Sequence, residues 1–233
     1  MATIECLTIL EQTSSTLIDF SIMPPALSTA PYRQVRACYN DTTIIVYQAY
    51  KESIAKAAVD AQKLNASPDF KSGRMTWIKP SWAWMMYRAG YSYKDPGQSR
   101  ILALRMKHEH FIALLERGVL SSHAHKLNPG EKRETTVDVR IQWDPERTAK
   151  LEVLPYRSIQ IGIPGALSEQ WANEWIVEIE DVTDKARELK RVIDERPGIT
   201  DEELLSMGLI FEERPFEVPE AVHTKLEMTD VPV

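Results

Sequence analysis

Hydrophobic and polar positions change period along this chain, and each change marks an expected element. Residues 42–50, TTIIVYQAY, form a β-branched and aromatic run that is typical of a strand. Residues 53–64 then place apolar side chains at helical spacing from Ile54 to Ala61, behind Ser53 as a cap. The pattern therefore predicts a strand followed by a helix.

A second strand and helix follow in residues 74–90. Gly73 precedes the short apolar stretch RMTWI, and the next helix starts at Pro80 or Ser81 and stops at Gly90. Asp144 and Pro145 predict a turn after a later strand. The other expected strands are 101–106, 135–143, 156–165 and 175–182, and the other expected helices are 110–118, 184–195 and a short one capped by Thr200 and Glu203.

Strands and helices mix without regular βαβ order, and the later strands alternate between apolar and polar positions. This pattern favours an α+β fold with a single mixed, mainly antiparallel sheet and flanking helices. Residues 1–31 are expected to form an extended lead-in, residues 32–211 a single catalytic domain, and residues 212–233 an acidic, Pro-containing tail that is loosely held.

The cysteine content indicates a protein of the reducing interior of the cell. The 233 residues suit one domain, and the two cysteines are too few for a disulfide framework. The N-terminus has no export pattern and no stretch is long enough to span a bilayer, so a cytoplasmic location without a membrane partner is expected.

The net charge of −6 conceals a division along the chain. Residues 71–110 hold eight cations and two acids, whereas residues 169–233 hold seven cations and eighteen acids. Such asymmetry suggests a polyanion-binding face beside an acidic region. Two differently charged solvated surfaces would give the same count.

Aromatic rings and cations are interleaved between Arg74 and Arg100 more densely than a core alone requires. Rings can stack on bases while cations hold phosphate or carboxylate, although the same rings could fill a core with the cations at its edge. The substrate-binding candidates from this block are Arg74, Trp77, Lys79, Trp84 and Lys94.

Four residues are candidates for a catalytic role. Ser81 lies at a strand-to-helix turn, where nucleophiles occur but where a helix N-cap is also common. Arg88 returns to the same helix face two turns later. Tyr47 and Gln48 are polar groups in an apolar strand, and either pair internally or face a pocket.

Later strands add further substrate-binding candidates. Arg157 and Gln160 are polar positions within an apolar strand. Glu178 and Glu180 share one strand face and could grip a guanidinium, or could simply form an exposed sheet face.

No cofactor or metal is expected. Neither Gly-rich phosphate-loop pattern is present, which argues against ATP-dependent chemistry by such a loop. The pairs His108 with His110 and His123 with His125 have a spacing that could hold a divalent metal, but their places at a junction and in a loop favour surface histidines.

The blocks YRQVRACYNDTTIIVYQAY, RMTWIKPSWAWMMYRAG with PGQSR, and YRSIQIGI resemble a family of bacterial and fungal domains of unknown function, from about Tyr32 to about Asp184. Fungal members resemble arginine-containing cyclodipeptide synthases. The resemblance implies an enzyme of secondary metabolism that closes amino acids from arginyl-tRNA and a second charged tRNA into a diketopiperazine, cyclo(Arg-Xaa).

The residues agree with this reading, because a cationic surface, stacking rings and an acidic pocket are what such an enzyme needs. The order of elements also resembles NAD-dependent ADP-ribosyltransferases and RNA 2′-phosphotransferases, although their usual catalytic patterns are not clearly present. A non-catalytic RNA-binding module is the third reading.

Overall fold

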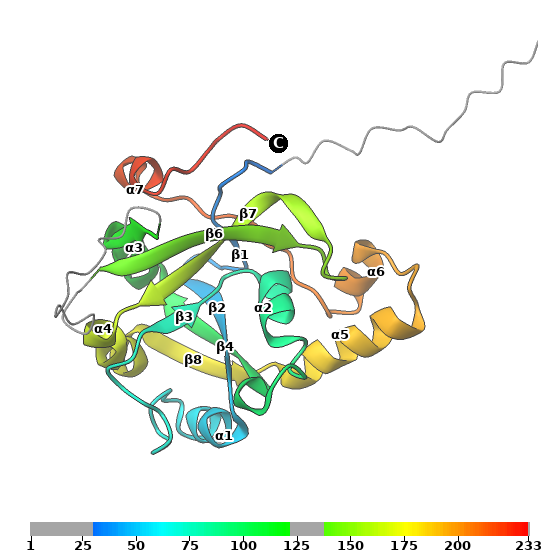
Figure 1. The fold of residues 1–233 in the computed structure, drawn as a ribbon, viewed down its shortest axis with the longest axis horizontal. Helices are drawn as coiled ribbons and strands as arrows, with labels where there is room; N and C mark the ends of the chain where they lie inside the picture. The colour runs from blue at the N-terminus through cyan, green and yellow to red at the C-terminus, as the bar shows by residue number, and fades with distance from the viewer. Residues whose placement is uncertain (1–29, 122–137, 233) are drawn as a thin grey trace, which may run out of the picture.

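The protein is described by a computed structural model that covers residues 30–121 and 138–232 (Figure 1). The expected α+β class is confirmed. The strands are β1 (Arg36–Ala37), β2 (Thr43–Tyr50), β3 (Thr76–Ile78), β4 (Arg100–Lys107), β5 (Gly118–Leu120), β6 (Val139–Arg147), β7 (Val153–Ile163), β8 (Ile176–Asp181) and β9 (Arg214–Pro215). The helices are α1 (Glu52–Ala61), α2 (Trp82–Ala89), α3 (His108–Glu116), α4 (Gly165–Gln170), α5 (Thr183–Glu195), α6 (Asp201–Ser206) and α7 (Glu220–Lys225), with a 3₁₀ turn, η2 (Pro96–Gln98), and a π-helical turn, η4 (Trp171–Trp175).

The strands form three sheets, so the expectation of a single sheet is wrong. Their orders are β1-β9, β2-β4-β8 and β3-β7-β6-β5, and most neighbours are antiparallel. The two larger sheets meet at one bridge, where the backbones of Tyr47 and Lys79 exchange hydrogen bonds of 2.6 and 3.2 Å. Pro80, which has no backbone N–H, follows Lys79 and helix α2 begins at Trp82, so the ladder cannot continue.

Alternation along β2 divides the interior. Ile44 and Val46 point into the main core between the two larger sheets, whereas Tyr47 points into a second core beneath α2 and α5. Because side chains alternate along β2, Gln48 lies on the opposite face of the strand from Tyr47. In Figure 1, α5 and α6 lie to the right of the sheets and α3, α4 and α7 to the left.

Strand β6 continues through the turn predicted at Asp144 and Pro145. The strand reaches Arg147, with a shift of register between Pro145 and Arg147. Proline is tolerated at such an irregularity, which is why the dipeptide does not end the strand. As a result, the side chains of Gln142, Asp144 and Glu146 occupy alternate positions of one continuous strand.

The acidic C-terminal segment packs on the domain, which corrects the expectation of a loosely held tail. Strand β9 pairs with β1, and Phe216, Val222 and Leu226 are buried in the main core. The high acid content of this segment led to the prediction of a loose tail, although these three apolar side chains are buried. Of the expected N-terminal lead-in, only residues 30 and 31 belong to the described part of the chain.

Candidate active site

A cavity of about 780 Å³ opens where β2, β3 and α2 come together. Five cations and one acid line it, together with four glutamine side chains and the ring of Trp77. The cations are Lys51, Lys71, Arg74, Lys79 and Arg88, the acid is Asp69, and the glutamines that line its wall from the strands are Gln48, Gln142 and Gln160, with Gln98 in the loop before β4. Lys51 forms an ion pair of 2.8 Å with Asp69, so the remaining cations give the cavity its excess positive charge.

Two polar side chains line this cavity from buried positions. Lys79 is 6% exposed, and its Nζ makes no hydrogen bond or ion pair with a described residue but is not fully shielded from solvent. Gln48 is also 6% exposed; its amide nitrogen donates to the Thr76 hydroxyl, but its Oε1 has no partner in the described part of the chain. Leaving such atoms unpaired is costly, which indicates that a ligand or solvent group satisfies them.

The environment of Lys79 also affects its charge. Burial, and secondarily the Arg88 guanidinium, lower the pKa of Lys79 to about 8, while the Asp144 carboxylate acts in the opposite direction. Asp144 is itself part-buried, with Oδ2 unpaired within the described residues, and burial raises its pKa. A lysine amine of this kind exchanges protons near neutral pH.

Two glutamine side chains on neighbouring strands complete one wall. The amide of Gln160 on β7 donates to Oε1 of Gln142 on β6 at 2.7 Å, and the two residues are directly opposite in the register. Each side chain keeps further donor or acceptor capacity toward the cavity. The wall is therefore suited to a ligand that has both donors and acceptors.

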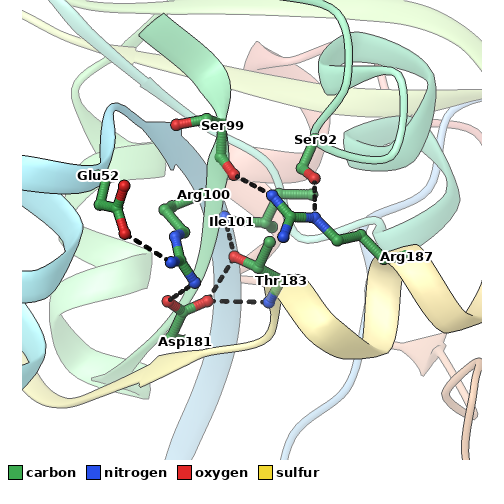
Figure 2. Close-up of polar contacts among 8 residues, drawn as sticks. All are labelled: Glu52, Ser92, Ser99, Arg100, Ile101, Asp181, Thr183 and Arg187. Atoms are coloured by element: carbon green, nitrogen blue, oxygen red, sulfur yellow. Dashed lines mark hydrogen bonds and ion pairs between the residues drawn. The ribbon is translucent and has the colours of Figure 1, made fainter. Parts of the chain in front are cut away.

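A polar network holds the loop that forms the rim beside η2 (Figure 2). Arg187 of α5 donates to the Ser92 hydroxyl at 2.9 Å and to the Ser99 carbonyl at 3.2 Å. Arg100 bridges Glu52 of α1 at 2.8 Å and Asp181 of β8 at 3.4 Å. Gly97 and Gln98 of this loop line the cavity, so the network fixes one side of its entrance.

A second, smaller cavity of about 300 Å³ lies at the N-terminus of α2. Ser81 is 1% exposed there; its hydroxyl accepts from the Trp84 backbone N–H and donates to Glu146 Oε1, both at 3.0 Å. The Glu213 carboxylate accepts from the Trp82 backbone N–H at 2.6 Å. Ser81 is thus the N-cap of α2, and two glutamates face the same space.

Both glutamates take up protons more readily than in water. Burial raises the pKa of Glu146, although hydrogen bonds from the Arg147 backbone and Ser81 oppose this effect. Glu213 is only half-buried as a residue, but its carboxyl group is surrounded by protein, and this burial together with the nearby Glu146 raises its pKa well above the usual range. Such carboxyls are stabilised by a bound cation.

The structure separates the predicted residues between these places. Gln48, Arg74, Trp77, Lys79, Arg88 and Gln160 meet at the large cavity. Ser81 lies at the small one, so Ser81 and Arg88 do not line a common cavity. Tyr47 is fully buried in the second core, and burial raises the pKa of its hydroxyl well above the usual range.

Trp84, Lys94 and Arg157 lie outside the lining of both cavities. Trp84 is buried and stacks on Tyr87 with ring centroids 4.9 Å apart, and Lys94 is exposed. Arg157 donates to the Tyr32 hydroxyl at 2.9 Å. These positions suit structural roles, as the alternative reading of the aromatic block allowed.

The acidic strand β8 does not form a pocket for a guanidinium. Glu178 and Glu180 are exposed, and Glu178 already pairs with Arg105 of the neighbouring strand at 2.8 Å. The recess that they share measures about 10 Å³, which is too small for an arginyl side chain. Glu178 and Glu180 therefore lie on an exposed face of the sheet, as the second interpretation of this strand expected.

The histidine pairs do not come together in a metal site in the described part of the chain. No group of three or more His, Cys, Asp or Glu with metal-binding geometry occurs there. The ring of His110 stacks on Trp175 with centroids 5.6 Å apart, and His123 and His125 lie outside the described residues. Within those residues, no helix is long and apolar enough to cross a membrane.

Sequence reasoning missed Gln142, Glu146 and Glu213. A signal for the first two existed, because Gln142, Asp144 and Glu146 are spaced by two, as on one strand face, but the Asp-Pro dipeptide suggested a turn. Glu213 had no such signal, since it lies in an acidic segment where its burial depends on distant contacts.

A family model described as "Domain of unknown function (DUF4291)" matches residues 34–216. The match covers both cavities. No curated protein matches the chain.

Proposed function

Because the chain belongs to the DUF4291 family, whose description assigns no activity, we propose its function from the site itself: it is a tRNA-dependent cyclodipeptide synthase. It would take an arginyl group and a second aminoacyl group from charged tRNAs and release cyclo(Arg-Xaa). The resemblance of the sequence blocks to fungal arginine-containing cyclodipeptide synthases supports the same reaction.

The observation that carries the proposal is the excess of cations in the large cavity. Lys71 and Arg74 have no ion-pair partner among the described residues and stand in the connection between α1 and β3, where they can hold backbone phosphates of an acceptor end. Trp77 and the glutamines offer a ring and amides to a terminal base. A charged RNA end matches this combination of groups.

An aminoacyl ester is already activated, so the reaction needs no ATP. The amine of one aminoacyl group attacks the ester carbonyl of the other, and the dipeptidyl ester then closes on itself. Ser81 is less suited to carry an acyl group, because its hydroxyl is buried and hydrogen-bonded on both sides. Direct attack of one amine on the other ester is therefore the favoured route.

The small cavity is the better candidate for arginyl recognition. Glu146 and Glu213 line it with carboxyls that burial makes reluctant to carry charge alone. A guanidinium bound between them would remove that cost through charge-assisted hydrogen bonds. Helix α2 has Ser81 in this cavity and Arg88 in the large one, so one helix spans both binding places.

The test is a reconstituted reaction with the full chain. Purified protein is incubated with tRNAs charged with labelled arginine and the other amino acids, and small products are identified by mass spectrometry. A diketopiperazine that contains arginine and that requires charged rather than uncharged tRNA is expected. Addition of ATP should not change its yield once the tRNAs are charged.

Two other results would contradict the proposal and identify the alternatives. Transfer of ADP-ribose from labelled NAD to protein or RNA, without a diketopiperazine, would indicate the transferase reading. Salt-dependent binding of tRNA without any product would indicate a non-catalytic RNA-binding module.

A further inference from the structure

Lys79 stands apart from the other cations of the large cavity because the fold both fixes and isolates it. Among the described residues, its backbone forms the one bridge between the two larger sheets, with Tyr47 as partner, and Pro80 follows directly. Its side chain lines the cavity but is 6% exposed. The backbone of Lys79 is therefore fixed by pairing with Tyr47 while its side chain lines the cavity.

The side-chain amine has no structural role that would occupy it. Nζ makes no hydrogen bond or ion pair with a residue of the ranges 30–121 and 138–232, and it is not fully shielded from the solvent of the cavity. Asp144 on β6 acts on it through space but makes no ion pair with it. A buried ammonium without a partner is unfavourable, so the neutral amine is unusually accessible for a lysine.

We propose that Lys79 is the general base of the cyclodipeptide reaction, an inference that rests on the proposed function. Its neutral amine accepts the proton that the attacking nitrogen loses as the new C–N bond forms. The same proton passes to the ribose oxygen as the ester C–O bond breaks, so the lysine returns to its neutral form and the tRNA leaves with a hydroxyl group. No oxidant or further reactant is required.

The proton affinities agree with this role. Burial beside Arg88 brings the pKa of Lys79 to about 8. An α-amino group has a pKa of about 8, so transfer between the two nitrogens is nearly balanced. Besides Arg88 and Asp144, the titratable and charged groups that face the cavity are Tyr50, Lys51, Asp69, Lys71 and Arg74.

Competitive acetylation tests the amine without any substrate. The intact protein reacts with trace acetic anhydride over a range of pH, and the peptides that contain Lys79 and Lys71 are quantified by mass spectrometry. Lys79 should show a midpoint near 8, well below the value of about 10.4 for a lysine side chain in water. A midpoint for Lys79 equal to that of Lys71 would overturn the inference.

Single-turnover kinetics with preformed charged tRNAs test the catalytic role. Lys79→Met keeps the bulk of the side chain and should slow product formation by about 10²–10⁴-fold, and Lys79→Arg should do the same because a guanidinium cannot accept a proton. Lys79→Ala should be partly restored by methylamine, with a pH dependence that follows the added amine. Lys190→Met, at a lysine of α5 outside the cavity lining, is the matched control and should retain its rate.

The results separate the two hypotheses. If the wild-type protein forms product and Lys79→Met forms it at the same rate, the base assignment fails and the proposed function stands. If the wild-type protein forms no product from charged tRNAs, the proposed function fails and the base assignment fails with it. A slow Lys79→Ala variant that no amine restores would indicate a structural role only.

Discussion

Glu146 and Glu213 share a cavity in which each makes the charge of the other more costly. Because burial raises both pKa values above 4.5, the folded state binds more protons than the unfolded state at a pH above that value. The free energy of unfolding should therefore fall as the pH rises from about 4.5 through the raised pKa values.

Glu213→Gln should flatten this decline and stabilise the protein by about 1 kcal/mol at pH 8 in the absence of ligand. Urea unfolding at a series of pH values measures the effect. Glu178→Gln removes a carboxylate at an exposed site outside this cavity and is the control. A wild-type stability that rises with pH in this window would contradict the expectation.

The same two carboxyls should decide substrate preference. With Glu146→Gln or Glu213→Gln, the preference for arginyl-tRNA over a tRNA charged with a neutral amino acid should fall by about 30-fold or more, because a buried guanidinium loses a charged partner. Competition between the two charged tRNAs measures it. Glu180→Gln should keep the wild-type preference for arginyl-tRNA. If Glu180→Gln lost this preference while Glu146→Gln and Glu213→Gln kept it, strand β8 would be the recognition site.

Helix α2 is the element that both cavities share, and its termini are fixed in different ways. Ser81 caps its N-terminus, and Gly90 ends it in the left-handed conformation with φ 54°. Ser81→Ala should lower the free energy of unfolding by about 0.5–2 kcal/mol, because the Trp84 N–H and Glu146 each lose a partner.

Turnover per folded molecule should survive that change. Thr200→Ala, which removes the capping-box residue of α6, is a matched control for the loss of a cap. Equal loss of stability in the two variants, with normal turnover in both, would agree with a cap at Ser81. A loss of about a hundredfold or more in turnover by Ser81→Ala alone would restore Ser81 as a nucleophile.

Local signals in the sequence predicted the elements better than the site. The cap and stop of α2 are encoded by Ser81 and Gly90 themselves, so the helix could be placed from its own residues. The ion pair of Arg105 could not be predicted from the sequence in this way. Its partner Glu178 lies 73 residues away and is brought opposite Arg105 only by the pairing of β4 with β8. Charges along a segment therefore do not tell which of them remain free.

At the scale of the whole molecule, the pairing of cations within the fold narrows the predicted RNA-binding surface. Arg100, Arg105 and Lys107 form ion pairs with acids of the protein. Arg74 and Arg88 face the cavity without such partners among the described residues. Together with Lys71, these side chains are expected to contact phosphate.

Arg74→Glu combined with Arg88→Glu should weaken tRNA binding and reduce the slope of log affinity against log salt by about 2. Filter binding at several salt concentrations measures both quantities. Lys56→Glu with Lys190→Glu makes the same charge change on α1 and α5 and should have a smaller effect. Equal losses in the two double variants would indicate only a long-range field.

The burial of the C-terminal segment has a consequence for how the protein is made. During synthesis, the ribosome still holds residues 212–232 after every other described strand and helix has emerged. Until they are released, the main core lacks Phe216, Val222 and Leu226, and the small cavity lacks Glu213. Until residues 212–232 emerge, folding during translation can therefore reach only a partly covered intermediate, which would need protection from aggregation.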